Sequence, residues 1–232
     1  MPVNQQATQP RSIRSFVRRA GRMTASQQRA MQELWPAMGI EFEARSLDLD
    51  DIFGRSAPLV VEIGFGNGDS LVQQAAEHPE CNFLGIEVHV PGVGHCLLAA
   101  RAAGLSNLRL VSHDAIEVLQ QMIPPASIAR LNLYFADPWP KKRHHKRRIV
   151  QPEFLQLVAS RLGEQGRFCL ATDWANYAQH IDEVFAASAL FACVERREHD
   201  GEAPLDRPAT KFERRGLKRG HRIVDWCFEK AR

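Results

Sequence analysis

The sequence lacks several features that would assign it to a simple class. No apolar run approaches the roughly 18 residues of a membrane-spanning helix, so an integral membrane protein is not predicted. The five cysteines are scattered without a Cys-x-x-Cys pair, which disfavours a zinc site and fits buried thiols in a reducing compartment. The formal net charge is only +3 over 232 residues, so the distribution of charge along the chain matters more than its sum.

Negative charge is missing from the start of the chain, where no acidic residue precedes Glu33. This segment has no apolar stretch of the kind found in secretory signals, although its Arg, Ser and Thr content is typical of a mitochondrial transit peptide. We predict a basic, partly flexible arm over residues 1–35. Contact with a polyanionic partner and simple solvated disorder both explain such an arm. Its arginines are Arg11, Arg14, Arg18, Arg19, Arg22 and Arg29.

The remainder, residues 36–232, is predicted to form a single α/β domain. Apolar strand-like runs alternate with helix-like stretches of ordinary length, which is typical of a mostly parallel sheet with helices on both faces. A polar stretch from about 197 to 220 contains Gly and Pro and is expected to be a long loop. The seven predicted strands lie within 57–68, 81–88, 107–115, 128–137, 166–174, 190–197 and 221–230.

A glycine loop follows the first predicted strand but lacks the last glycine of a dinucleotide-binding fingerprint. In "VEIGFGNGD", Gly64, Gly66 and Gly68 allow a tight turn, yet Asp69 occupies the sixth position of G-x-G-x-x-G. Glu62 adds negative charge that repels a pyrophosphate and tolerates a cation. S-adenosylmethionine is cationic at sulfur and carries no phosphate. The loop therefore favours this methyl donor, and a nicotinamide-dependent dehydrogenase is disfavoured.

Acidic residues stand at the ends of four successive predicted strands. Glu62 precedes the glycine loop, Glu87 ends the second strand, Asp114 follows the third and Asp137 follows the fourth. Ligands of open α/β sheets bind at this carboxyl edge, where a carboxylate can accept ribose hydroxyls. Asp114 is suited to accept a hydrogen bond from the amino group of adenine. Any one of these acids alone could be an ordinary surface residue, whereas acids at the ends of four successive strands predict a ligand site.

The stretch "ADPWPKKRHHKRRIV" combines a carboxylate, an aromatic ring and dense positive charge. Pro138 and Pro140 stiffen the loop that carries Asp137 and Trp139. An acid beside an aromatic ring fits a nucleobase pocket, through hydrogen bonds to the base edge and stacking on its face. The following "KKRHHKRR" can contact phosphates, although a basic run can also be a plain solvated surface. We interpret the stretch as a nucleic-acid-binding segment next to a reactive centre.

These motifs resemble the bacterial tRNA (guanine-N7-)-methyltransferase family. The resemblance rests on "VEIGFGNGDSL", "FLGIEVHVPGVG", "DPWPKKRHHKRRIVQPEFL", "ATDWANYA" and "RPATKFERRGLKRGHRIVD", and extends from about residue 11 to 228. It implies a Rossmann-like class I methyltransferase fold with a mostly parallel seven-stranded sheet. It also implies methyl transfer from S-adenosylmethionine to N7 of the guanine at position 46 of the tRNA variable loop. A cytoplasmic enzyme that acts on tRNA, without a metal, a membrane or an obligatory protein partner, is expected.

The resemblance also implies roles for individual residues. Asp137 matches the proposed catalytic position. The cofactor-binding residues implied are Glu62, Gly64, Glu87, Asp114 and Asp137. The substrate-binding residues implied are Lys141, Asp173, Thr210, Lys211, Phe212 and Glu213. The RNA-binding residues implied are Arg143, His144, His145, Lys146, Arg147 and Arg148.

Two other functions remain open at the level of the sequence. A methyltransferase acting on an exocyclic amine would use a loop of the (N/D)-P-P-(Y/F) type, from which Trp139 and Pro140 depart. A nucleic-acid-binding protein could keep the same fold without turnover. The intact glycine loop and its acids speak against this second alternative.

Overall fold

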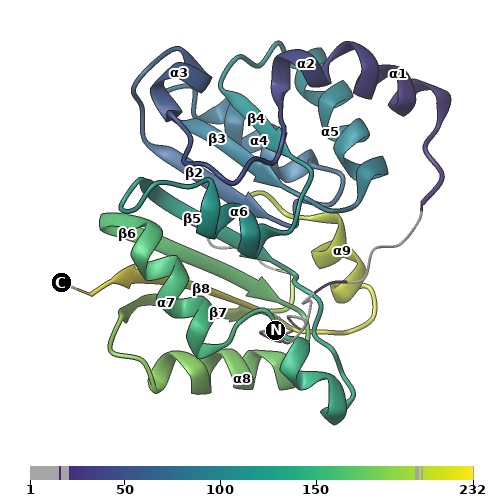
Figure 1. Ribbon diagram of the computed structural model, residues 1–232. Helices are drawn as coiled ribbons and strands as arrows, with labels where there is room; N and C mark the ends of the chain where they lie inside the picture. Colours follow the sequence, from purple (N-terminus) through teal and green to yellow (C-terminus); the bar gives the residue numbers. More distant parts are fainter. Residues whose placement is uncertain (1–15, 17–20, 202–203, 205, 232) are drawn as a thin grey trace, which may run out of the picture.

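The computed structural model describes residues 16, 21–201, 204 and 206–231 of the chain (Figure 1). Arg11, Arg14, Arg18 and Arg19 of the predicted basic arm lie outside these described residues. No helix within the described ranges is both long and apolar enough to cross a membrane.

Strands and helices alternate through most of the chain. The strands are β1 (Gly39–Ile40), β2 (Leu59–Ile63), β3 (Asn82–Ile86), β4 (Leu108–Val111), β5 (Ile128–Tyr134), β6 (Leu162–Thr172), β7 (Phe191–His199) and β8 (Ile223–Lys230). The α-helices are α1 (Ala25–Glu33), α2 (Trp35–Met38), α3 (Leu49–Phe53), α4 (Asp69–Glu77), α5 (Val90–Ala102), α6 (Ala115–Gln121), α7 (Pro152–Arg161), α8 (Ala175–Ala186) and α9 (Lys211–Leu217). A 3-10 helix, η1, spans Lys142–Arg147.

All these strands belong to one sheet with the order β1-β4-β3-β2-β5-β6-β8-β7. Strand β8 runs antiparallel to β6 and β7, and the remaining neighbours pair in parallel. The predicted Rossmann-like α/β fold with a mostly parallel sheet is confirmed. The predicted count of seven strands is wrong by one, because β1 adds a two-residue strand beside β4. Two residues are too few to produce a periodic pattern in the sequence.

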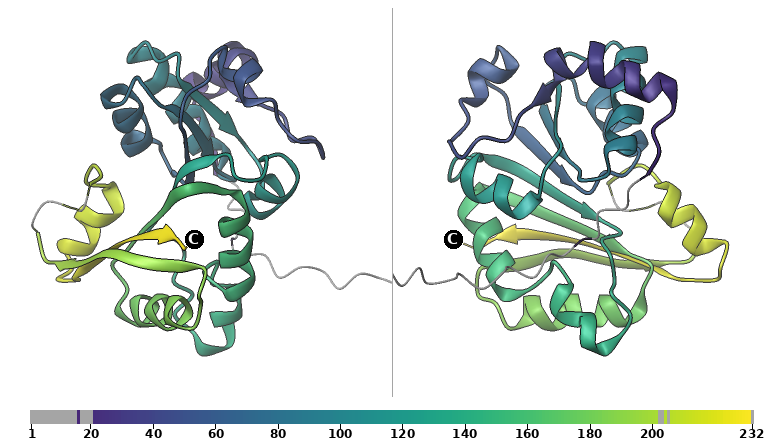
Figure 2. Two further views of the ribbon diagram at one scale, coloured as in Figure 1. Left: turned by 90° about the vertical axis from the view of Figure 1, so that its left-hand side faces the viewer. Right: turned by 45° about the vertical axis from the view of Figure 1, so that its right-hand side comes forward.

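The sheet separates two hydrophobic layers. On one face, Leu131 and Phe168 pack with helices α6, α7 and α8 in the larger core. On the other face, α1, α4 and α5 cover β3 and β4 in a second core around Leu97. Figure 2 shows α9 against β6 and β8 on the side opposite α7 and α8. Side chains alternate between the faces along each strand, so neighbouring residues of β8 serve different layers.

The segment 197–220, for which the sequence predicts a long loop, is partly regular. Strand β7 continues to His199, and α9 occupies Lys211–Leu217. Thr210 caps this helix by accepting a hydrogen bond from the Glu213 N–H, and the Glu213 side chain accepts one from the Thr210 N–H. This reciprocal capping box is encoded by the spacing Thr-x-x-Glu, which the polar composition of the segment conceals.

Candidate functional site

A cavity of about 580 Å³ lies at the carboxyl edge of the parallel strands. It is bounded by the residues that directly follow β2, β3, β4 and β5 and by one side of α9. A volume of this size falls within the usual range for small-molecule sites. The polar lining includes three of the acids identified in the sequence. These are Glu87, Asp114 and Asp137.

The glycine loop is held in place by the carboxylate of Glu87. One oxygen of Glu87 accepts a hydrogen bond from the Gly66 N–H at 2.9 Å. The other accepts from the N–H groups of Val88 and His89 at 2.7 and 2.9 Å. A carboxylate offers about four acceptor positions, so one remains for a hydroxyl group in the cavity. This arrangement fits the predicted ribose contact, which stays a prediction.

The start of α5 approaches the glycine loop very closely. A methyl group placed on Gly92 would lie 2.1 Å from the carbonyl oxygen of Gly66. Gly64, Gly66 and Gly68 all have positive φ angles, between 61° and 83°, which a residue with a side chain rarely adopts. The loop therefore depends on glycine both for its own backbone and for its contact with α5.

The remaining predicted cofactor acids occupy different environments. Asp114 caps α6 by accepting a hydrogen bond from the Ile116 N–H at 2.9 Å, and it also lines the cavity. Glu62 is buried and does not line the cavity; it accepts a hydrogen bond from Gln74 Nε2 at 3.2 Å. Burial raises the pKa of Glu62 to about 7, although Gln74 and two arginines act in the opposite direction. The structure thus brings Glu87, Asp114 and Asp137 together and places Glu62 behind them.

The loop that carries Asp137 has an unusual backbone. Phe135 and Trp139 adopt φ angles of 54° and 44°, although neither is glycine. Such strained residues persist only where surrounding contacts fix them, and they often occur at functional sites. Arg148 supplies one of these contacts. Its guanidinium is buried and donates to the carbonyl of Pro138 at 2.9 Å and to Asn176 Oδ1 at 2.6 Å.

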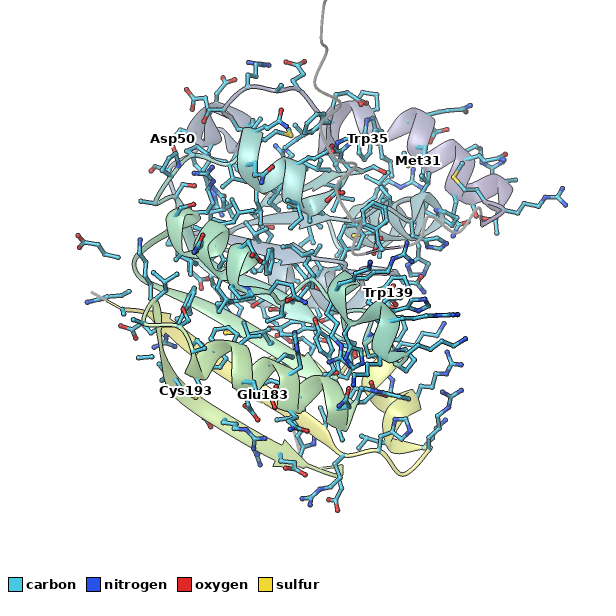
Figure 3. The ribbon with its side chains drawn as sticks, turned by 60° about the horizontal axis from the view of Figure 1, so that its bottom comes forward. Met31, Trp35, Asp50, Trp139, Glu183 and Cys193 are labelled. Carbon is cyan, nitrogen blue, oxygen red and sulfur yellow. The ribbon has the colours of Figure 1, made fainter. Side chains whose placement is uncertain are left out.

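The basic segment after this loop forms the 3-10 helix η1 and gathers positive charge around Trp139. The Arg147 guanidinium lies 4.6 Å from the centre of the Trp139 ring, and the His144 ring meets the same ring edge-on at 5.8 Å. Desolvation and the neighbouring Arg143 lower the pKa of His144, which favours its neutral form. Figure 3 shows Trp139 among many side chains that end in nitrogen. In this basic segment Arg143 and Lys146 are exposed, whereas Arg148 is buried.

The six predicted substrate residues do not share one environment. Phe212 is 54% exposed and lines the cavity. Glu213 is only 1% exposed and forms an ion pair with Arg207. Asp173 accepts a hydrogen bond from His221 Nδ1 at 3.0 Å and lies outside the cavity lining. Lys141 and Lys211 are exposed and lie outside the cavity lining. Thr210 is half-buried at the start of α9.

Sequence reasoning did not identify several residues that line the cavity. His113 stacks on Phe42 with ring centres 3.8 Å apart, and its position directly before Asp114 was a usable signal. Arg215 follows Phe212 by three residues, so both emerge on the same side of α9. Phe16 belongs to the basic arm, where no local pattern indicates contact with the cavity. Within the described ranges, no group of three or more His, Cys, Asp or Glu side chains could hold a metal ion.

The chain is similar to proteins of one family along most of its length. A family model described as "Putative methyltransferase" matches residues 56–226. The tRNA (guanine-N(7)-)-methyltransferase of Sodalis glossinidius is 54% identical over 221 residues, which are 95% of this chain and 92% of that protein. The protein of the same name from Aeromonas hydrophila is 53% identical over 221 residues, which are 95% of this chain and 93% of that protein.

Solved structures share the fold at low sequence identity. The 16S rRNA methyltransferase KamB superposes with a TM-score of 0.57 at 14% identity, covering 80% of this chain and 93% of that chain. A 16S rRNA (adenine(1408)-N(1))-methyltransferase from Catenulisporales acidiphilia, solved with its cosubstrate SAM, gives a TM-score of 0.53 at 15% identity. That superposition covers 80% of this chain and 92% of the other.

Proposed function

This chain belongs to the tRNA (guanine-N(7)-)-methyltransferase family, and we propose that it methylates N7 of the guanine at position 46 in the tRNA variable loop. The observation that carries the proposal is the cavity itself. It combines Glu87, Asp114 and Asp137 at three successive strand ends, and the chain continues from Asp137 directly into a basic surface segment.

The residues around the cavity fit S-adenosylmethionine as methyl donor. When bound, this compound supplies an electrophilic methyl group on a positively charged sulfur. Glu87 retains acceptor capacity for ribose hydroxyls, and Asp114 can accept from an adenine amino group. Acids around the cavity favour a cationic ligand, and Gly64 leaves space for its close approach. A structurally similar methyltransferase that carries SAM supports this choice of donor.

Methylation of guanine N7 does not require a general base from the protein. N7 holds a lone pair and no proton, so the new N–C bond forms as the S–C bond breaks and no proton has to leave. The protein must align the reacting atoms and stabilise the positive charge that develops on the guanine ring. Asp137 is exposed and lines the cavity, and its carboxylate would stabilise this charge or accept from guanine N1–H and the amino group.

The tRNA backbone would be held by the surface around η1. Lys142, Arg143 and Lys146 are exposed there, and each cation that neutralises a phosphate makes binding more salt-dependent. Arg148 is buried against Pro138 and Asn176, so we assign it to holding the loop of Asp137. Arg147 is engaged with Trp139 and would present that ring to RNA.

Nucleoside mass spectrometry tests the proposal directly. The purified protein is incubated with unmodified tRNA and isotopically labelled S-adenosylmethionine, and the tRNA is then digested. Labelled 7-methylguanosine is expected. Label on an exocyclic amine would refute transfer to N7 and identify an amine methyltransferase. Binding of tRNA without any label would instead identify an RNA-binding protein that does not turn over.

A further inference from the structure

Helix α9 is too short to hold its own position. It has seven residues, from Lys211 to Leu217, and isolated helices of this length are unstable in water. Nevertheless it forms one wall of the cavity through Phe212 and Arg215. Contacts with the rest of the fold must therefore fix α9, and they determine where these two side chains stand.

A buried cluster of charged side chains joins the start of α9 to the sheet. Arg207 Nη1 donates to Glu213 Oε2 at 2.6 Å, and Arg207 Nε donates to Asp225 Oδ1 at 2.7 Å. His199 Nε2 lies 3.0 Å from the second oxygen of Asp225. Each of these four residues is less than 9% exposed. Glu213 thus connects through one guanidinium to strand β8, and Asp225 connects onward to strand β7.

The charges in this cluster depend on one another. Burial alone lowers the pKa of Arg207, but Asp225 and Glu213 outweigh that effect and raise it. Glu213 also accepts a hydrogen bond from the Thr210 N–H, so one carboxylate both caps α9 and binds the arginine. Removing either acid would leave a buried guanidinium with incomplete compensation, which is much more disruptive than losing a surface pair.

The other end of α9 is docked by a close contact. A methyl group placed on Gly216 would lie 2.8 Å from Asp173 Oδ2, so the helix backbone rests against this carboxylate. Asp173 in turn pairs with His221, just beyond the helix. With both ends fixed, Phe212 and Arg215 are left on the side that faces the cavity. Figure 2 shows the helix near the ends of β6 and β8.

We propose that Glu213 is a positioning residue, which acts through Arg207 and Asp225 to dock α9, and that it does not touch the target guanine. The inference rests on the proposed function, because it assigns how the substrate wall of that site is held. A side chain that is 1% exposed, and whose Oε2 accepts from Arg207 and the Thr210 N–H, has no surface to offer a nucleobase.

A double-mutant cycle distinguishes docking from direct contact. Glu213→Gln, Asp225→Asn and the double variant are compared by kcat/KM for tRNA. Asp225 lies outside the cavity lining, yet docking predicts that each single variant loses about 100-fold, as expected for a displaced wall. The double variant should then lose little more than either single variant. Glu198→Gln is the matched control, because Glu198 adjoins His199 in sequence and its ion pair with Arg222 is exposed.

A loss confined to Glu213→Gln, or a double variant whose loss is the product of the two single losses, would overturn the proposal. Hydrogen exchange provides a second measurement that needs no turnover. In Arg207→Lys the amides of α9 should exchange faster than in the wild type, while those of α5 stay unchanged. Unchanged exchange in α9 would also overturn the docking role. If the wild type forms no 7-methylguanosine, the proposed function fails, and the exchange experiment still decides the role of Glu213.

Discussion

Replacing the buried Glu62 by glutamine is expected to change how the stability of the protein depends on pH. In the folded protein the pKa of Glu62 is raised from 4.5 to about 7 by burial. The folded state therefore holds the proton more tightly than the unfolded state does. The resulting stability is fully present below pH 4.5 and is lost as the pH rises through 7.

The size of this effect follows from the two pKa values. Each pH unit between the folded and unfolded pKa corresponds to roughly 1.4 kcal/mol, so the full contribution of Glu62 is about 3.5 kcal/mol. Most of it, about 2.5 kcal/mol, disappears between about pH 5 and pH 8. Glutamine stays neutral throughout this range and can still accept the hydrogen bond from Gln74. Glu62→Gln should therefore gain about 2.5 kcal/mol relative to the wild type from about pH 5 to pH 8.

Urea unfolding followed by circular dichroism at several pH values across this range measures this difference. Taking the difference between variant and wild type removes the groups that titrate in both proteins. Glu77→Gln makes the same chemical change at an exposed position of α4 and controls for the loss of one formal charge. A difference between Glu62→Gln and wild type that stays constant with pH would refute the assignment of a raised pKa to Glu62.

Ligand binding offers an independent view of the same residue. The positive charge of S-adenosylmethionine favours the ionised form of a nearby carboxylate. At neutral pH the wild type should therefore release up to about half a proton on binding, since the pKa of Glu62 is about 7. Calorimetry in buffers of different ionisation enthalpy measures this release, and Glu62→Gln should show none. No release from the wild type would place the bound cation away from Glu62.

Three further predictions concern the rest of the site. Asp137→Ala should abolish methyl transfer and leave tRNA affinity largely intact in filter binding, because its carboxylate lines the cavity and is not part of the basic segment. Equal loss of methyl transfer and tRNA affinity would indicate that Asp137 only shapes the pocket. Gly92→Ala should abolish S-adenosylmethionine binding in calorimetry, since its methyl group would lie 2.1 Å from a carbonyl of the glycine loop; unchanged binding would show that α5 can move away. Neutralising Arg143 and Lys146 should flatten the salt dependence of tRNA binding by up to about 0.9 in the log–log slope for each phosphate that is no longer neutralised, whereas Arg148→Ala should mainly lower the melting temperature. The reverse pattern would contradict the assignment of Arg148 to the interior.

The edge of the sheet could be predicted from the sequence because strand ends converge. Glu87, Asp114 and Asp137 are far apart in the chain, yet parallel pairing brings the strands before them into one sheet, with only β2 between β3 and β5. Acids after successive strands must then meet at one edge. The same reasoning could not show that Glu62 lies behind the cavity, because its burial depends on Gln74 of α4 covering that point of the sheet.

Neighbouring residues of the same type in a polar segment differ in whether the fold buries them. Arg147 and Arg148 are adjacent in a basic run, but one stacks on Trp139 and the other is enclosed by Pro138 and Asn176. Nothing in the local pattern distinguishes them, since the contact of Arg148 with Asn176 depends on where α8 packs. Within α9 a usable signal did exist. The Thr-x-x-Glu spacing marks a capping box, which already ties the Glu213 side chain to the helix start.

A chain of hydrogen bonds that is buried at Glu62 and exposed at Asp206 runs from the strand before the glycine loop to the segment that precedes α9. Gln74 donates to Glu62 at 3.2 Å, and Asn132 donates to Gln74 at 3.3 Å. Arg130 donates to Asn132 at 2.9 Å and to Asp206 at 2.6 Å. Asp206 directly precedes Arg207 in sequence, and its exposed side chain ends this chain of hydrogen bonds. Because hydrogen bonds in a low-dielectric interior polarise one another, a substitution at Glu62 that breaks its hydrogen bond to Gln74 should also weaken the bond between Gln74 and Asn132.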